Sequence, residues 1–222
     1  MPSISIFDVI GPNMVGPSSS HTAGAVAIAL LVKKMVNGPM KKVEFVLYGS
    51  FAKTYKGHGT DRALLGGILG FETDDLRIRD SFRLAEEYGL DYSFRVDEKE
   101  TEVHPNTVEI HVYSEGSVTM SVRGVSLGGG KVKIVRINGI DVDFTGEYST
   151  LIIRHMDYPG VVAYIATCLS ERNVNIAFMR LFRERKGATA YSVVESDEEI
   201  PQKLLDKLKE HPKVEDVMLV QV

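Results

Sequence analysis

Three serines, a histidine and a threonine stand together near the beginning of the chain and are its strongest candidates for chemistry. The run is Ser18-Ser19-Ser20-His21-Thr22, at the start of a predicted helix. A helix start carries unpaired N–H groups and a partial positive charge, which suit a carboxylate or a phosphate. The hydroxyls add donors, and His21 can titrate near neutral pH. The alternative is an ordinary serine cap on the helix, with His21 facing solvent.

A second candidate segment runs from Gly49-Ser50 to Asp61 and ends in Lys56-Gly57-His58-Gly59-Thr60-Asp61. Glycines on both sides of His58 would let a ligand approach the backbone closely, just before another predicted helix start. The spacing is not that of a dinucleotide-binding fingerprint, since Arg62 stands where the third glycine would be. A flexible glycine hinge with an exposed histidine would have the same sequence.

A third histidine occurs in His104-Pro105-Asn106-Thr107, where the proline holds His104 extended. Asn106 and Thr107 could bind a polar ligand, and a simple turn before a strand would use the same residues. His111 and His155 fall within or at the end of predicted strands, so we assign them structural or surface roles.

Composition limits the partners that these segments can have. The chain of 222 residues is 44% hydrophobic and has a formal net charge of −4, which is typical of a globular protein. Because basic and acidic residues are interleaved, no broad positive surface for nucleic acid is expected. The longest apolar stretch, residues 23–32, is too short to cross a membrane. No Lys or Arg precedes Lys33, so no basic leader is predicted and a cytoplasmic location is expected.

The single cysteine, Cys168, limits metal chemistry. Structural zinc and iron–sulfur sites need several ligands, so one cysteine cannot complete either. We therefore expect no metal site in this chain, and any metal chemistry would come from another chain.

The elements that must position the candidate residues predict an α+β domain over residues 1–146. Asn37-Gly38-Pro39 would end the first helix, Thr60 could cap the second and Asp74 the third. Helices are expected over residues 20–36, 60–69 and 74–88, and strands over 43–48, 92–96, 108–113, 118–125, 132–137 and 142–144. Helices early and strands late are typical of the α+β class.

The remaining residues, 147–222, switch regularly between strand and helix periods and predict a βαββαβ order. Strands are expected over 151–153, 174–182, 188–195 and 214–222, with helices over 161–172 and after Pro201 at the first helical position. Two helices on one face of a four-stranded antiparallel sheet is the ferredoxin-like arrangement.

Together, the Ser18–Thr22 and Lys56–Asp61 segments resemble the β chain of iron–sulfur-dependent L-serine dehydratase (L-serine ammonia-lyase). The resemblance covers essentially the whole chain, including His104–Thr107. Residues 150–222 look like an ACT domain, through Asp157-Tyr158-Pro159-Gly160-Val161 and Asn173-Val174-Asn175-Ile176. The first domain also resembles the allosteric substrate-binding domain of some phosphoglycerate dehydrogenases.

The resemblance implies a subunit that is inactive alone. A partner α chain would hold a [4Fe–4S] cluster, and this chain would complete the active site that converts L-serine to pyruvate and ammonia. His21 would be the catalytic residue, either as an acid–base group or as a ligand of the substrate carboxylate. The residues that the resemblance places at the substrate are Ser18, Ser19, Ser20, Thr22, His58, Gly59, Thr60, Asp61, His104 and Asn106.

The resemblance also implies regulation. ACT domains pair, so a homodimer through this domain is expected, with a small amino acid such as L-serine bound at Gly160, Val161, Asn175 and Ile176. A different class of function remains open: a non-catalytic amino-acid sensor built from a ligand-binding domain and an ACT domain. A sensor would not need three histidine-bearing loops directed toward a partner's cluster.

Overall fold

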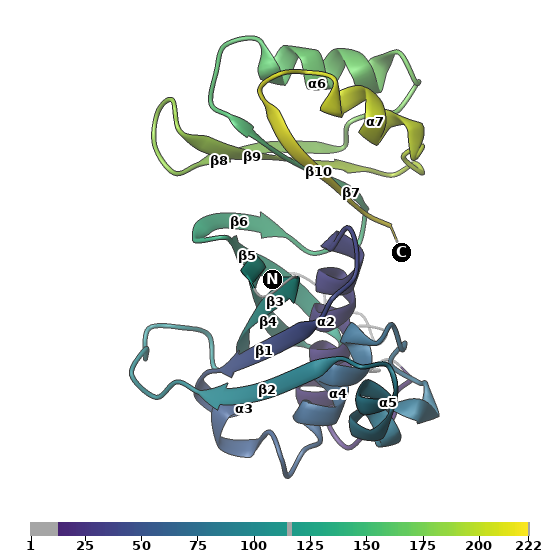
Figure 1. The fold of residues 1–222 in the computed structure, drawn as a ribbon, viewed down its shortest axis with the longest axis vertical. Coiled ribbons are helices and arrows are strands. Elements are labelled where there is room, and N and C mark those ends of the chain that lie inside the picture. Colours follow the sequence, from purple (N-terminus) through teal and green to yellow (C-terminus); the bar gives the residue numbers. More distant parts are fainter. Residues whose placement is uncertain (1–12, 115–116, 222) are drawn as a thin grey trace, which may run out of the picture. The chain divides into compact units, whose positions relative to one another are not determined.

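The computed structural model describes residues 13–114 and 117–221, and the chain divides into two compact units, Met1–Asn138 and Gly139–Val222 (Figure 1). The strands form two sheets. Gly11 and Pro12 before the serine run, and Val222 at the end of the last predicted strand, lie outside the described residues.

The first unit is built on a mixed sheet whose first five strands have the order β2-β1-β3-β4-β5. The strands are β1 (Lys42–Leu47), β2 (Asp91–Val96), β3 (Thr107–Ser114), β4 (Ser117–Gly128) and β5 (Lys131–Ile137). β1 pairs with β2 in parallel and with β3 antiparallel, so Val43 lies opposite Tyr92 on one side and Val112 on the other. A parallel pair needs a crossover, and the chain between β1 and β2 supplies it as helices.

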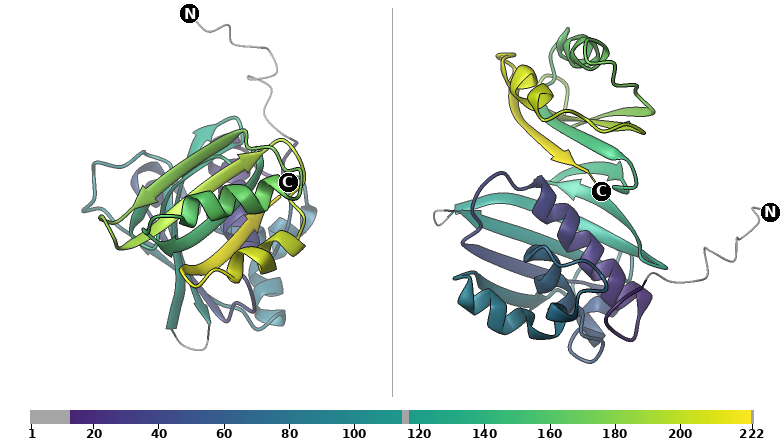
Figure 2. Two further views of the ribbon diagram at one scale, coloured as in Figure 1. Left: turned by 90° about the horizontal axis from the view of Figure 1, so that it is seen from above. Right: turned by 90° about the vertical axis from the view of Figure 1, so that its right-hand side faces the viewer.

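The helices of this unit lie in the order η1 (Ser19–Ala23, a π-helical turn), α2 (Gly24–Met35), α3 (Gly49–Thr54), α4 (Thr60–Ile68), η2 (Leu76–Asp80) and α5 (Ser81–Glu87). Figure 2 shows α2 lying along one face of the sheet. α2 packs on β4 and β5 and against α4. The crossing of α2 and α4 is close, since a Cβ on Gly67 would lie 2.5 Å from the Val26 carbonyl oxygen. This contact joins the two helices that follow the two candidate segments.

Several predicted boundaries in this unit are wrong in detail. Thr60 does not cap α4, because the cap position is Gly59 in the left-handed region at φ 68°. The helix expected from Asp74 is instead η2, capped by Asp75, followed by α5. The short helix α3 was not expected at all, because its sequence has a glycine start and no apolar periodicity.

A buried ion-pair network lies on the sheet face opposite α2. Arg123 Nη2 donates to Glu109 Oε2 at 2.6 Å, and its Nη1 donates to Glu100 Oε1 at 2.6 Å. Tyr48 and Ser121 complete the network through their hydroxyls. Arg123 is 7% exposed. A buried charge must be paired and hydrogen-bonded to be tolerated, and Arg123 satisfies this with two carboxylates.

The second unit has the ferredoxin-like order predicted from its sequence. Its antiparallel four-stranded sheet runs β10-β7-β9-β8. After β6 (Ile140–Phe144), the elements are β7 (Ser149–Met156), α6 (Val161–Ser170), β8 (Phe178–Arg183), β9 (Thr189–Ser196), α7 (Lys203–Lys209) and β10 (Val214–Val220). Both helices cover one face of this sheet (Figure 2).

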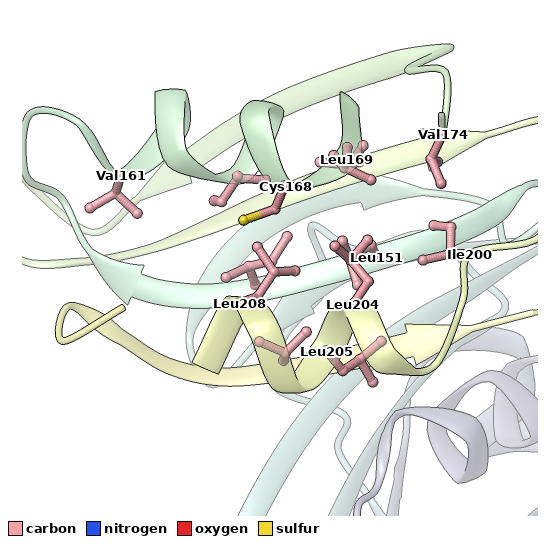
Figure 3. Close-up of a cluster of buried hydrophobic side chains, with 13 residues drawn as sticks. Leu151, Val161, Cys168, Leu169, Val174, Ile200, Leu204, Leu205 and Leu208 are labelled. Carbon is pink, nitrogen blue, oxygen red and sulfur yellow. The ribbon is translucent and has the colours of Figure 1, made fainter. Parts of the chain in front are cut away.

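Aliphatic side chains from both helices form the core of this unit. Leu169 and Cys168 of α6, Leu204 and Leu208 of α7 and Leu151 of β7 belong to one buried cluster (Figure 3). Cys168 is 2% exposed and behaves as a small core residue. The helical period, in which residues spaced by three and four share one face, predicts Val162, Ile165, Ala166 and Leu169 on the buried face of α6. Ile165 and Leu169 are buried as predicted, but Val162 is 38% exposed and Val161 lies in the core in its place.

Two predicted boundaries in the second unit are wrong. β8 begins at Phe178, so Asn175 precedes that strand and does not begin it. α7 begins at Lys203, two residues after Pro201, which therefore does not occupy the first helical position. Among the described residues, no helix is long and apolar enough to span a membrane.

Candidate functional site

The serine run forms a capped π-helical turn ahead of α2. Ser18 is the cap, with an extended backbone and a hydroxyl that accepts a hydrogen bond from the His21 amide at 3.2 Å. The capping interpretation is therefore confirmed for Ser18. π-helical turns are rare and often occur at functional sites. His21 lies within this turn, with its ring directed into the protein instead of toward solvent.

Both nitrogens of the His21 ring lie next to serine hydroxyls. Nε2 is 2.9 Å from Ser50 Oγ on α3, and Nδ1 is 3.3 Å from Ser18 Oγ. The ring also packs edge-on against Phe51 and His58, with centroids 5.3 Å and 4.9 Å away. The structure thus brings the histidines of the first two candidate segments together, although 36 residues separate them in sequence.

Burial lowers the pKa of His21, and the neighbouring His58 lowers it further. Burial disfavours the charged imidazolium, and a second histidine adds a like charge when protonated. The lowered pKa favours the neutral imidazole. A neutral ring has one unprotonated nitrogen, which a general base requires.

A hollow of about 330 Å³ lies beside this pair of histidines. Thr22, His58 and Gly59 line it together with the backbone of Gly16 and Gly57. Three cationic side chains also line it: Lys56, Arg62 and Arg79. Thr22 Oγ1 donates to the His58 carbonyl oxygen at 3.3 Å and so links the two candidate segments at the wall of the hollow. The positive charge of these three side chains makes the hollow suitable for an anion such as a carboxylate.

Three polar atoms around the site are buried without a hydrogen-bond partner among the described residues. They are His58 Nδ1, Thr60 Oγ1 and Ser126 Oγ. An unpaired buried polar group costs about 1–3 kcal/mol, and native structures contain few of them. Two further such atoms among the described residues, Ser81 Oγ and Arg154 Nε, belong to residues outside the candidate segments.

The remaining residues of the first two segments have local roles. The Ser19 carbonyl accepts the Gly24 amide, and Ser20 Oγ lies next to Gly128 at the end of β4. Asp61 Oδ1 accepts the Arg62 amide at 2.8 Å, and burial raises the pKa of this carboxyl. None of these three side chains lines the hollow.

The third segment supports the site through its backbone more than through His104. The His104 ring is exposed, and its Nδ1 accepts the Asn106 amide at 3.2 Å. The Asn106 carbonyl and side-chain amide both pair with the backbone of Ser126. The Pro105 carbonyl accepts the Ser50 amide at 2.7 Å. This loop therefore positions α3 and the end of β4 around His21.

Sequence reasoning placed Ser50 in a candidate segment without giving it a role, and it missed Ser126. The Ser50 hydroxyl contacts the His21 ring. Gly24 packs against Ser126 so closely that a Cβ on Gly24 would lie 2.1 Å from the Ser126 hydroxyl oxygen. Ser50 belongs to the same glycine-flanked stretch as His58, but its role depends on α3, which the sequence did not reveal. No local motif surrounds Ser126.

The described residues offer no ligand set for a metal. No group of three or more His, Cys, Asp or Glu side chains among them could hold an ion, and Cys168 lies in the core of the second unit. The described residues therefore do not fit an iron–sulfur cluster.

The residues expected to bind an effector lie around the start of α6 and before β8. Gly160 caps α6 at φ 95°, in the left-handed region that favours glycine, with no atom within 4 Å of its Cβ position. Val161 is buried in the core. Asn175 is exposed, and its amide donates to Glu198 Oε2 at 2.7 Å. Ile176 packs against the core cluster, so its side chain has a structural role.

Comparison with known proteins matches both units to families. The serine dehydratase beta chain model matches residues 5–136, and the ACT domain model matches residues 149–213. The chain belongs to the serine dehydratase beta chain family. It is 45% identical over 204 residues to the L-serine dehydratase beta chain of Peptoniphilus asaccharolyticus, covering 92% of each chain. It is 39% identical over 210 residues to the probable L-serine dehydratase beta chain of Bacillus subtilis (strain 168), covering 95% of this chain and 94% of the other.

A more distant match is to D-3-phosphoglycerate dehydrogenase of Bacillus subtilis (strain 168). The two are 27% identical over 194 residues, which is 87% of this chain but 36% of that enzyme. The family membership confirms the resemblance drawn from Ser18–Thr22 and Lys56–Asp61. The allosteric-substrate-binding type of the first unit remains a prediction.

Proposed function

We propose that this chain is the β subunit of a two-chain, [4Fe–4S]-dependent L-serine dehydratase, a cytoplasmic lyase that converts L-serine to pyruvate and ammonia. The observation that carries the proposal is the meeting of His21 and His58, from the two family motifs, beside a cationic hollow. The size and charge of the hollow suit a small amino acid bound through its carboxylate.

The residues of this chain have two tasks in the proposal, which are binding and proton transfer. Lys56, Arg62 and Thr22 face the hollow and would hold the carboxylate. His21 would accept or return a proton at a ring nitrogen. A neutral imidazole attracts a carboxylate less strongly than an imidazolium does, so the lowered pKa of His21 favours the acid–base role over the ligand role.

The cluster is assigned to the α chain, because the described residues offer no ligand set for it and the sequence has a single cysteine. An iron ion with an open position can act as a Lewis acid. The unpaired polar atoms of His58, Thr60 and Ser126 are on the elements that would face the substrate and the α chain. This chain would thus contribute one wall of a shared active site and be inactive alone.

The ACT domain is proposed to pair with that of a second copy and to bind L-serine as an effector. β8 is at the edge of its sheet, and Phe178 and Leu181 on it are each 45% exposed. An exposed apolar edge strand is a template for pairing with another chain. Open space at Gly160 would let an amino acid approach the amides at the start of α6.

The direct test is anaerobic reconstitution with the α chain, measuring pyruvate formed from L-serine. This chain alone should form none, and the two chains together should turn over. Turnover by this chain alone would refute the two-chain proposal. Absence of turnover from the reconstituted pair, together with serine binding to this chain, would instead support the amino-acid sensor.

A further inference from the structure

Ser50 contacts the imidazole of His21 at Nε2. Its hydroxyl oxygen lies 2.9 Å from Nε2, a good hydrogen-bond distance, whereas the Ser18 contact at Nδ1 is longer at 3.3 Å. A serine hydroxyl can donate or accept, so Ser50 can pair with either tautomer of His21. With both ring nitrogens held, the ring cannot turn without losing a contact.

Ser50 is itself fixed by contacts at its backbone. Its amide donates to the Pro105 carbonyl at 2.7 Å, and its carbonyl accepts the Thr54 hydroxyl at 2.9 Å. Gly49, directly before it, has φ 51°, and a Cβ there would lie 2.7 Å from the same Pro105 oxygen. Only glycine fits this approach without strain. The His104–Thr107 loop therefore sets where α3 begins and where the Ser50 hydroxyl points.

Ser50 does not line the cationic hollow of about 330 Å³ in which the substrate is proposed to bind. His58 lines that hollow, and His21 reaches it only through its ring contact with His58. Ser50 lines a different hollow of about 750 Å³, whose wall carries Glu100 and Lys53. His21 thus contacts one residue of each hollow, His58 and Ser50.

We infer that Ser50 is the positioning residue for His21. It orients the imidazole through the contact at Nε2, without touching the substrate. The expected effect on kcat rests on the proposed function, whereas the expected effect on the orientation of the His21 ring does not. Orienting a reacting group supplies a large part of an enzyme's rate enhancement, and a small misplacement of that group lowers the rate strongly.

Two measurements on the full chain test this inference. The first is the pair of ¹⁵N chemical shifts of the His21 ring, measured on this chain alone. The second is the kcat and KM for L-serine of the enzyme reconstituted with the α chain. Ser50→Ala removes the hydroxyl, and Ser50→Thr keeps it, with room for the extra methyl because Ser50 lines a hollow. Ser93→Ala removes a hydroxyl at another half-buried position, on β2.

Ser50→Ala should shift the ¹⁵N signal of His21 Nε2, because this nitrogen loses its hydrogen-bond partner, and lower kcat roughly 10-fold or more with KM little changed. Ser50→Thr should restore both, and Ser93→Ala should match the wild type. Unchanged ring shifts in Ser50→Ala, or a rise in KM at constant kcat, would overturn the inference. If the reconstituted wild type shows no turnover, the proposed function fails, and the ring shifts alone decide the role of Ser50.

Discussion

The crossing of α2 and α4 predicts opposite effects for two neighbouring glycines of α4. A Cβ on Gly67 would lie 2.5 Å from the Val26 carbonyl oxygen and 2.6 Å from the Ala29 Cβ. A Cβ on Gly66 would meet a side-chain atom of Ile78 at 3.1 Å. Gly67→Ala therefore forces two helix backbones apart, whereas Gly66→Ala requires one side chain to shift by a few tenths of an ångström.

The size of the difference follows from these distances. Both substitutions gain the same helix propensity, about 1 kcal/mol for Gly to Ala. Overpacking costs about 1–3 kcal/mol, and the high end applies to Gly67 because the backbone of α2 cannot yield locally. We expect Gly67→Ala to destabilise by about 2 kcal/mol and Gly66→Ala to be neutral or slightly stabilising.

Equilibrium urea unfolding of the full chain, followed by circular dichroism, measures both variants against the wild type. Hydrogen exchange of the α4 amides shows whether the loss of stability is located at the crossing of α2 and α4. Because α2 and α4 follow the segments that carry His21 and His58, Gly67→Ala should also separate the two rings. Equal stability of the two variants would refute the close crossing.

Three further predictions concern the network on the sheet and the ACT domain. Arg123→Met should lower the free energy of unfolding by about 3 kcal/mol, because it leaves the carboxylate of Glu109 buried without its cation. Urea unfolding measures this loss, and Arg95→Met, which removes an exposed ion pair, should have little effect in the same assay. Burial alone would raise the pKa of Glu109, but hydrogen bonds from Ser121 and Arg123 lower it below the usual glutamate value. The stability that this lowered pKa supplies is present above the usual glutamate pKa and is lost as the pH falls through the lowered pKa. Glu109→Gln should therefore flatten the acid limb of a curve of unfolding free energy against pH. Isothermal calorimetry of the chain should detect millimolar L-serine binding that Asn175→Ala weakens, and equal binding by both would leave the ACT domain as a dimerisation unit only.

The second unit could be predicted almost completely because its signals are local. Strand and helix periods alternate without interruption, and Leu204 and Leu208 lie one turn apart on α7 as expected. The errors are at ends, where β8 begins four residues later than expected. Asn173, which stops α6, adopts a positive φ of 54°, and the following residues finish the turn before the strand starts.

The first unit was harder because its decisive contacts are distant in sequence. The parallel pairing of β1 with β2 depends on a crossover of several short helices, and no local pattern specifies it. His21 and His58 could be found as motifs, but their contact could not. The role of Ser50 was missed because α3 is six residues long and its start depends on the distant Pro105 carbonyl.

The central claim is that His21 performs proton transfer in a dehydratase completed by the α chain. The measurement that tests it most directly is kcat/KM for L-serine of His21→Ala and His111→Ala, each reconstituted anaerobically with the α chain. His111 lies on β3 beside Glu109 and outside the hollow, so it is the matched histidine control. His21→Ala should lower kcat/KM by at least ~10²-fold, the usual scale for a lost acid–base group, with His111→Ala close to wild type. Equal kcat/KM for the two variants would contradict the account and leave the serine run as a helix cap.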